Sequence, residues 1–280
     1  MGTVRVVTDS ACDLTAGQAD EHGIVVVPLT IRFGSEELVD RDQLSTKEFW
    51  DRVMTGNTMP ATAAPSPGAF RQAFEDAADG GADGVLCINL SSELSATYQS
   101  AVAAADSVAE RIPVSVLDSR TVTLGQGLLV LAAAELAAAG HPLSEITAQL
   151  DELQRRTHVF GVVASLDFLR KGGRIGGAAH LVGSLLSIKP VIEVRGGVVA
   201  VESKQRTRAR SLQYLAGKAL GAGRLERLAV ANGAAQDIDE VLQLLAGATP
   251  VHELIVSDLG PVVGSHTGPG TVGVCFQLAP

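Results

Sequence analysis

Three side chains that carry hydroxyl or imidazole groups lie in segments whose composition predicts chain turns. Thr62 lies between Pro60 and Pro65, Ser95 follows a predicted strand, and His266 lies among glycines and hydroxyl residues near the carboxyl end. Uncharged donors satisfy the oxygens of an anion by hydrogen bonding without neutralising its charge. If the fold brings these residues together, the sequence predicts recognition of a small anionic head group such as a carboxylate.

Each of these residues also has an ordinary structural interpretation. Thr62 would be a turn residue, Ser95 a helix cap and His266 a loop histidine. A catalytic interpretation makes Ser95 a nucleophile and His266 its base, as in a serine-dependent acyl hydrolase. No Gly-x-Ser-x-Gly turn surrounds Ser95, which argues against the hydrolase.

Two further motifs lack the spacing of nucleotide-binding loops. Thr8–Ser10 follows the first predicted strand, where a dinucleotide-binding protein carries Gly-x-Gly-x-x-Gly. Lys171–Arg174 has the composition of a phosphate loop but not the Walker spacing, so we interpret it as structural. The sequence therefore predicts neither a nucleotide cofactor nor phosphoryl transfer by this chain itself.

The overall charge argues against two classes of partner. The chain has 22 Lys and Arg against 31 Asp and Glu, a formal net charge of -9. Such a chain has no electrostatic footprint for nucleic acid or for an anionic membrane surface. Basic side chains gather only at Lys204, Arg206, Arg208 and Arg210. The first three form either a solvated strand edge or a docking patch for an acidic or phosphate-bearing partner.

The cysteines and the apolar stretches predict the compartment. Cys12, Cys87 and Cys275 are odd in number and far apart, so they form neither a disulfide framework nor a metal motif. The longest apolar stretch, residues 128–139, contains Glu135 and is too short to cross a bilayer. We expect a cytoplasmic protein without stable membrane insertion.

Strand and helix patterns alternate along the chain in the manner of an α/β protein. The predicted strands of the first half are Val4–Thr8, Ile24–Ile31, Gly84–Asn89 and Val114–Leu117. A helical stretch over Thr123–Arg156, broken near Pro142, bridges to the second half. There the predicted strands are Val159–Ala164, Lys189–Val194, Val198–Ser203, Leu228–Asn232, Val251–Ser257 and Thr271–Gln277.

We predict two domains from this order of elements. Residues 1–156 would form an α/β/α domain with a parallel sheet, because its strands alternate with helices. Residues 157–280 would form a second α/β domain with a mixed sheet, because a predicted tight hairpin at residues 195–197 joins two of its strands. In parallel sheets ligands bind beyond the carboxyl ends of the strands, where Ser95 is predicted to lie.

With these residues in place, the chain resembles the DegV family of fatty-acid-binding proteins, which includes subunits of bacterial fatty acid kinase. The blocks that carry the resemblance are Thr8–Ser10, Pro65–Pro67, Leu94–Ala101, Asp118–Ser119, Gly125–Gly127, Leu169–Ile175, Leu186–Pro190 and Gly264–Gly270. The resemblance implies a parallel-sheet domain joined to a mixed-sheet domain. It also implies a long-chain fatty acid as ligand, with no cofactor.

The resemblance further implies roles for single residues. Thr62 and Ser95 would bind the fatty acid carboxylate with His266 close by, and Arg206 would dock a partner. The implied partner is a separate ATP-dependent kinase related to dihydroxyacetone kinase. It would phosphorylate the bound acid, and the acyl phosphate would enter phospholipid synthesis. This chain would be the carrier and not the enzyme.

The chain departs from the family pattern at two places near these residues. Ala63 and Ala64 stand where the family has Ser-Gln, and Ala96 stands where it has glycine. These replacements remove polar groups and a bare glycine close to Thr62 and Ser95. We therefore expect the chain preference or the head-group affinity to differ from that of other members.

Overall fold

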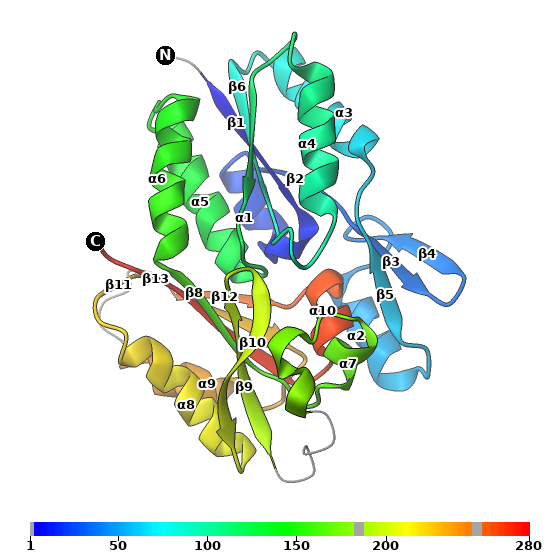
Figure 1. The fold of residues 1–280 in the computed structure, drawn as a ribbon, viewed down its shortest axis with the longest axis vertical. Helices are drawn as coiled ribbons and strands as arrows, with labels where there is room; N and C mark the ends of the chain where they lie inside the picture. The colour runs from blue at the N-terminus through cyan, green and yellow to red at the C-terminus, as the bar shows by residue number, and fades with distance from the viewer. Residues whose placement is uncertain (1–2, 182–187, 248–253) are drawn as a thin grey trace.

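The computed structural model describes residues 3–181, 188–247 and 254–280 and contains three sheets, one of four strands, one of six and a small one of three (Figure 1). The predicted α/β class, with a parallel sheet and a mixed sheet, is confirmed. The first two residues of the Leu186–Pro190 block and the first three of the predicted strand Val251–Ser257 lie outside the described residues.

The four-stranded sheet is parallel throughout and has the order β2-β1-β6-β7. Its strands are β1 (Val4–Asp9), β2 (Val25–Val27), β6 (Gly84–Asn89) and β7 (Val114–Asp118). Helices cover both faces, so all residues of β6 are buried. The covering helices are α3 (Pro67–Asp79) and α4 (Thr97–Val108) on one face, and α5 (Leu124–Ala138) and α6 (Leu143–Arg155) on the other.

The predicted strand Ile24–Ile31 is wrong as a single element. It divides into β2 and β3 (Thr30–Phe33), with Pro28 between them, because proline has no N–H to donate to a ladder. The strand β3 pairs antiparallel with β4 (Glu36–Val39) and β5 (Pro60–Ala63). The predicted turn around Thr62 is therefore also wrong, since pairing with β3 draws this proline-rich segment into a strand.

The six-stranded sheet is mixed and has the order β10-β9-β8-β13-β11-β12. Its strands are β8 (Thr157–Val162), β9 (Lys189–Arg195), β10 (Val198–Gln205), β11 (Leu225–Gly233), β12 (Leu254–Asp258) and β13 (Thr271–Leu278). The helices α8 (Arg208–Leu220) and α9 (Ile238–Leu245) pack on its outer face. The predicted hairpin is confirmed as the antiparallel pair of β9 and β10.

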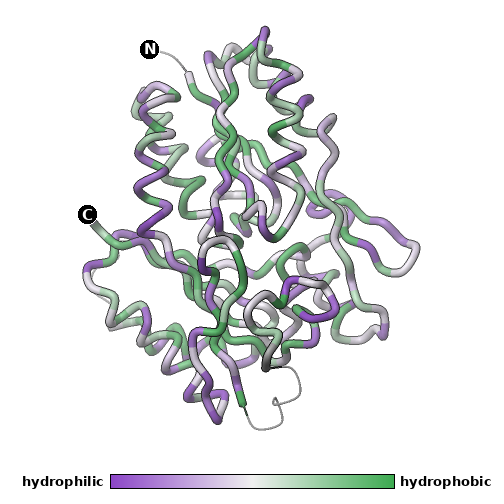
Figure 2. Tube along the Cα trace, viewed as in Figure 1, coloured by the Kyte–Doolittle hydropathy of each residue, from purple (hydrophilic) through white to green (hydrophobic). Residues whose placement is uncertain are grey.

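Helix α5 packs between the two large sheets. Its residues from Leu124 to Ala134 are all buried, and it contacts β1 and β6 on one side and β8, β11 and β13 on the other. A helix that contacts a sheet on each side needs apolar side chains on every face. This requirement explains why the longest apolar run of the sequence lies in α5 (Figure 2). Over the described ranges, no helix is both long and apolar enough to cross a membrane.

Shorter elements surround the junction between the sheets. They are η1 (Ser10–Cys12), α1 (Ala16–Glu21), α2 (Thr46–Thr55), α7 (Asp167–Lys171), η2 (Gly176–Leu181) and α10 (Pro261–Thr267). The predicted position of His266 in a loop is wrong, because Pro261 occupies the first turn of α10 and the helix continues through His266.

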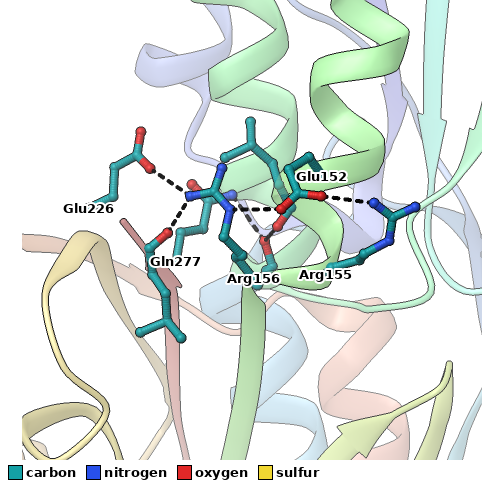
Figure 3. A network of polar contacts seen from close by, with 8 residues as sticks. Glu152, Arg155, Arg156, Glu226 and Gln277 are labelled. Carbon is teal, nitrogen blue, oxygen red and sulfur yellow. Dashed lines mark hydrogen bonds and ion pairs between the residues drawn. The ribbon is translucent and has the colours of Figure 1, made fainter. Parts of the chain in front are cut away.

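A polar network ties the end of α6 to the mixed sheet at the predicted domain boundary (Figure 3). The Arg156 guanidinium donates to the carbonyl of Leu278 at 2.6 Å and lies 3.5 Å from the Glu226 carboxylate of β11 and 3.7 Å from Glu152 of α6. The strands that precede Arg156 belong to the parallel sheet or the three-stranded sheet, and the strands that follow it belong to the mixed sheet. One apolar cluster nevertheless contains both Leu86 of β6 and Cys275 of β13. The division into domains at residues 156 and 157 stays a prediction.

Candidate functional site

A cavity of two adjoining lobes lies between the parallel sheet and the inner face of the mixed sheet. The lobes have five lining residues in common, which are Val122, Leu169, Val199, Val263 and Thr267. The polar lobe is further lined by Leu29, Thr62, Leu90, Leu94, Ser95, Arg174, Val262 and His266. The apolar lobe is further lined by Thr123, Val159, Phe160, Gly161, Ile192, Glu193, Val194, Leu259, Thr271 and Gly273.

Thr62 and His266 meet directly in the polar lobe although 204 residues separate them in sequence. The Thr62 Oγ1 and His266 Nε2 atoms are 2.9 Å apart, and both side chains are partly buried. Thr62 comes from β5 and His266 from α10, and these two elements pack against each other. The predicted proximity of His266 to Thr62 is therefore present in the structure.

The imidazole of His266 is neutral at physiological pH. Burial, with a smaller effect from the positive charge of Arg174, lowers the pKa of His266 from 6.5 to about 4. Its Nδ1 atom is buried and has no hydrogen-bond partner among the described residues. A neutral imidazole carries one N–H, so its Nε2 either donates to or accepts from the Thr62 hydroxyl.

Ser95 lies in the same lobe, between the end of β6 and the start of α4. Its Oγ lies 2.9 Å from Thr97 Oγ1 and accepts a hydrogen bond from the Thr97 backbone N–H at 3.3 Å. Ser95 thus lies just before α4, as predicted, and it lines the polar lobe, although the N-cap residue of α4 is Ala96. Within the described ranges, no hydrogen bond joins Ser95 to His266, so the contact that a hydrolase dyad needs is not formed.

Arg174 brings a permanent positive charge to the polar lobe. Its Nε donates to the carbonyl of Leu94 at 3.1 Å, and its Nη1 donates to the carbonyl of Gly172 at 2.6 Å. The interpretation of Lys171–Arg174 as purely structural is incomplete, because Arg174 also lines the cavity. In the sequence, Arg174 follows two glycines, but the segment does not have the spacing of a phosphate loop. Nothing in the sequence therefore predicted that the Arg174 side chain lies in the same lobe as Thr62.

Buried contacts from the first half of the chain hold α10, the helix that carries His266. The Asp13 carboxylate, only 4% exposed, accepts a hydrogen bond from Gly260 N at 2.9 Å and another from Thr123 Oγ1 at 2.6 Å. Burial raises the pKa of Asp13 to about 7. At Gly264 a Cβ would lie 2.6 Å from the Phe49 ring, so α10 reaches α2 only with glycine there. Sequence reasoning missed Asp13 because its partners are distant in sequence.

Arg206 lies outside the cavity, between the end of β10 and the start of α8, and is exposed. Of the predicted basic cluster, Arg208 is bound to Asp237 through two hydrogen bonds of 2.9 Å. No ion pair of Arg206 or Lys204 occurs among the residues the structure describes. The structure therefore places Arg206 on the surface, apart from Thr62, Ser95 and His266.

The chain matches one family model over almost its whole length. A model described as "Uncharacterised protein, DegV family COG1307" matches residues 3–279. The chain belongs to the DegV family. Among curated DegV proteins, it is 35% identical to the DegV domain-containing protein SCO2569 of Streptomyces coelicolor, over 97% of each chain. It is 32% identical to Protein DegV of Bacillus subtilis, over 98% of each chain.

Solved DegV structures have the same fold. A fatty-acid-binding DegV family protein from Thermus thermophilus superposes with a TM-score of 0.90 at 34% identity, covering 99% of this chain and 100% of that one. DegV of Bacillus subtilis, described as a fatty acid binding protein, gives a TM-score of 0.90 at 30% identity, covering 100% of both chains. Both of these solved DegV proteins are described as binding fatty acids.

Proposed function

We propose that this DegV protein binds a long-chain fatty acid, with the acyl chain in the apolar lobe and the carboxylate in the polar lobe. The observation that carries the proposal is the cavity itself, which is apolar along most of its wall and carries Thr62, Ser95, Arg174 and His266 at one end. That distribution matches the chemistry of a fatty acid, and fatty acid binding by similar DegV proteins supports it.

The acyl chain supplies most of the affinity in this proposal. Burying about fourteen methylenes of a sixteen-carbon acid at roughly 0.8 kcal/mol each gives about 11 kcal/mol before the costs of ordering. The polar groups then orient the acid, because a carboxylate buried without partners would lose its solvation. Hydrogen bonds from Thr62 and Ser95 and the charge of Arg174 keep the carboxylate ionised.

The contact between His266 and Thr62 prepares the hydroxyl as a donor. If His266 Nε2 carries the proton and donates to Thr62 Oγ1, the Thr62 hydroxyl hydrogen is free to point at the carboxylate. The low pKa of His266 keeps the ring neutral, so that it adds no second charge beside Arg174.

Native mass spectrometry of the purified protein, followed by denaturing extraction and lipid analysis, tests the binding proposal. We expect one fatty acid per chain. We also expect Thr62→Ala and Ser95→Ala to retain less of it, because each removes a donor to the carboxylate. A protein that is empty and takes up no added fatty acid would contradict the proposal.

We further propose that the bound acid is presented to a separate ATP-dependent kinase related to dihydroxyacetone kinase, in the cytoplasm, for phospholipid synthesis. A carboxylate oxygen would attack the terminal phosphate of ATP, forming the acyl phosphate and releasing ADP. The family resemblance and the exposed position of Arg206 support docking at that residue. Arg206→Glu should lower acyl phosphate formation with the kinase without changing fatty acid retention.

Arg71→Glu on α3 is the matched control for the docking experiment. Arg71 is also exposed, but it lies on a helix that covers the parallel sheet. If the two variants supported the same rate of acyl phosphate formation, Arg206 would not be part of the docking surface. The hydrolase alternative has no supporting contact between Ser95 and His266, and turnover of a short-chain ester abolished by Ser95→Ala would be needed to revive it.

A further inference from the structure

Two glycines face each other across neighbouring strands in the floor of the apolar lobe. Gly161 of β8 pairs with Gly273 of β13, and both line the lobe. The row of paired residues that crosses the sheet at this level is Val201, Ile192, Gly161, Gly273, Ala231 and Ser257. Its centre therefore has no side chain longer than a methyl group.

The alternation of side chains along these strands shows that this row faces the cavity. Phe160, Val162, Val272 and Val274 flank the two glycines in sequence and belong to the apolar cluster under α8 and α9. Successive residues of a strand point to opposite faces, so positions 161 and 273 point the other way. Ile192, the neighbour of Gly161 in the row, packs with Leu169 and Val199, which line the cavity.

Neither the backbone nor close packing requires glycine at these two positions. Neither residue has a positive φ. A Cβ at position 161 would lie 3.6 Å from Ile192 Cγ1, and one at 273 would lie 3.4 Å from Ala231 Cβ, both ordinary contacts. Glycine inside a strand destabilises a protein, because the unfolded chain has more freedom to lose. What the two glycines provide is the space above them.

We propose that Gly161 and Gly273 set the length of the acyl chain by leaving the floor of the apolar lobe bare for its last methylenes. This inference rests on the proposed fatty acid binding. The polar lobe fixes the carboxylate at one end of the cavity, so the position of this floor determines how many methylenes fit. Side chains at positions 161 and 273 would occupy the same space as the end of the chain.

The test is a binding series with straight saturated acids of about ten to about eighteen carbons, using the full chain and the double variant Gly161→Ala, Gly273→Ala. For the unchanged protein, affinity should rise with length until the lobe is filled. In the double variant the rise should stop about two carbons earlier, because two methyl groups take the space of about two methylenes. The longest acid that the unchanged protein accommodates should bind about fifteen-fold more weakly, at about fourfold per excluded methylene.

A stability measurement separates this role from simple disruption of the sheet. The empty double variant should unfold at the same or a higher temperature than the unchanged protein, while binding long acids more weakly. Gly217→Ala on α8 is the matched control, since a Cβ there meets open space, and it should leave the length profile unchanged. The single variants should each give about half of the shift.

The outcomes distinguish the inference from the function on which it rests. In one outcome, the unchanged protein binds acids and the affinity of the double variant stops rising at the same acid length. The assignment of Gly161 and Gly273 is then overturned while fatty acid binding stands. If the unchanged protein binds no acid of any length, the proposed function is itself overturned. A lower unfolding temperature with uniformly weaker binding at all lengths would also overturn the assignment.

Discussion

The two lobes of the cavity differ in how the chain builds them. The polar lobe draws Thr62, Ser95, Arg174 and His266 from four segments of the chain, with Thr62 and His266 bonded to each other and Ser95 and Arg174 bonded to other residues. The apolar lobe lies largely on one sheet, whose strand register determines which side chains reach it. The polar lobe is thus assembled from a strand, loops and a helix end, whereas the proposed space for the end of the acyl chain comes from two glycines in a regular row of paired residues.

The largest expected effect concerns Arg174, which carries a permanent charge into the polar lobe. Arg174→Gln should weaken fatty acid binding about 10-fold to 100-fold, because hydrogen bonds to charged groups contribute about 1.5–3 kcal/mol. Binding of the fatty alcohol of the same length should change little, because it has no charge for Arg174 to hold. Isothermal titration with both ligands measures the difference.

Arg170→Gln is the matched control for Arg174→Gln. Arg170 is an exposed residue of α7 that pairs with Asp167 outside the cavity, so its loss should leave both ligands unaffected. An equal loss of acid and alcohol binding by the Arg174 variant would show that this arginine only anchors Leu94 and Gly172. The contrast between the recognition of the head group in one lobe and of the acyl chain in the other would then fail.

A smaller effect is expected from pH, again confined to the polar lobe. Between pH 6.5 and about 4, the unfolded chain binds a proton at His266 that the folded protein does not bind. The contribution of His266 to the free energy of unfolding therefore rises with pH and is lost on acidification. From pH 7 to pH 5, the unchanged protein should lose about 2 kcal/mol more than His266→Gln does. Urea unfolding at each pH measures both.

Only the difference between the two proteins isolates His266. Asp13 titrates in the opposite sense, since its raised pKa stabilises the folded protein as the pH falls toward 4. This contribution is common to the unchanged protein and to His266→Gln and cancels. His22→Gln, at the exposed end of α1, is the matched control. Parallel pH profiles for the unchanged protein and His266→Gln would contradict the assignment.

The smallest of the three effects is expected at Thr62. Thr62→Val keeps the shape of the side chain but removes the hydroxyl, and its hydrogen bond to the ionised carboxylate contributes about 1.5 kcal/mol, the low end for bonds to charged groups. Fatty acid binding should weaken about tenfold, with the preferred chain length unchanged. Thr55→Val at the exposed end of α2 should have no effect on binding. A shift in chain length would mean that the two lobes are not independent.

Much of the fold was predictable because apolar periodicity is a local signal. The buried strand Gly84–Asn89 and the apolar helix over Leu124–Ala138 follow directly from residue types. Two predictions failed because pairing with other strands decided the outcome, whereas His266 was misplaced although Pro261 is a local signal for the start of a helix. The segment with Thr62 becomes a strand because β3 lies beside it, and Ile24–Ile31 divides at Pro28 with its two ends in different sheets.

The alternation of strands and helices and the residue types available for an anionic head group could be read from the sequence alone. That Arg174 joins Thr62, Ser95 and His266, and that Gly161 lies opposite Gly273, became known from the three-dimensional arrangement. Side-chain chemistry and helix or strand preference act over a few residues. Strand register and helix docking instead depend on contacts between segments that are separate in the sequence, and no local pattern specifies those contacts.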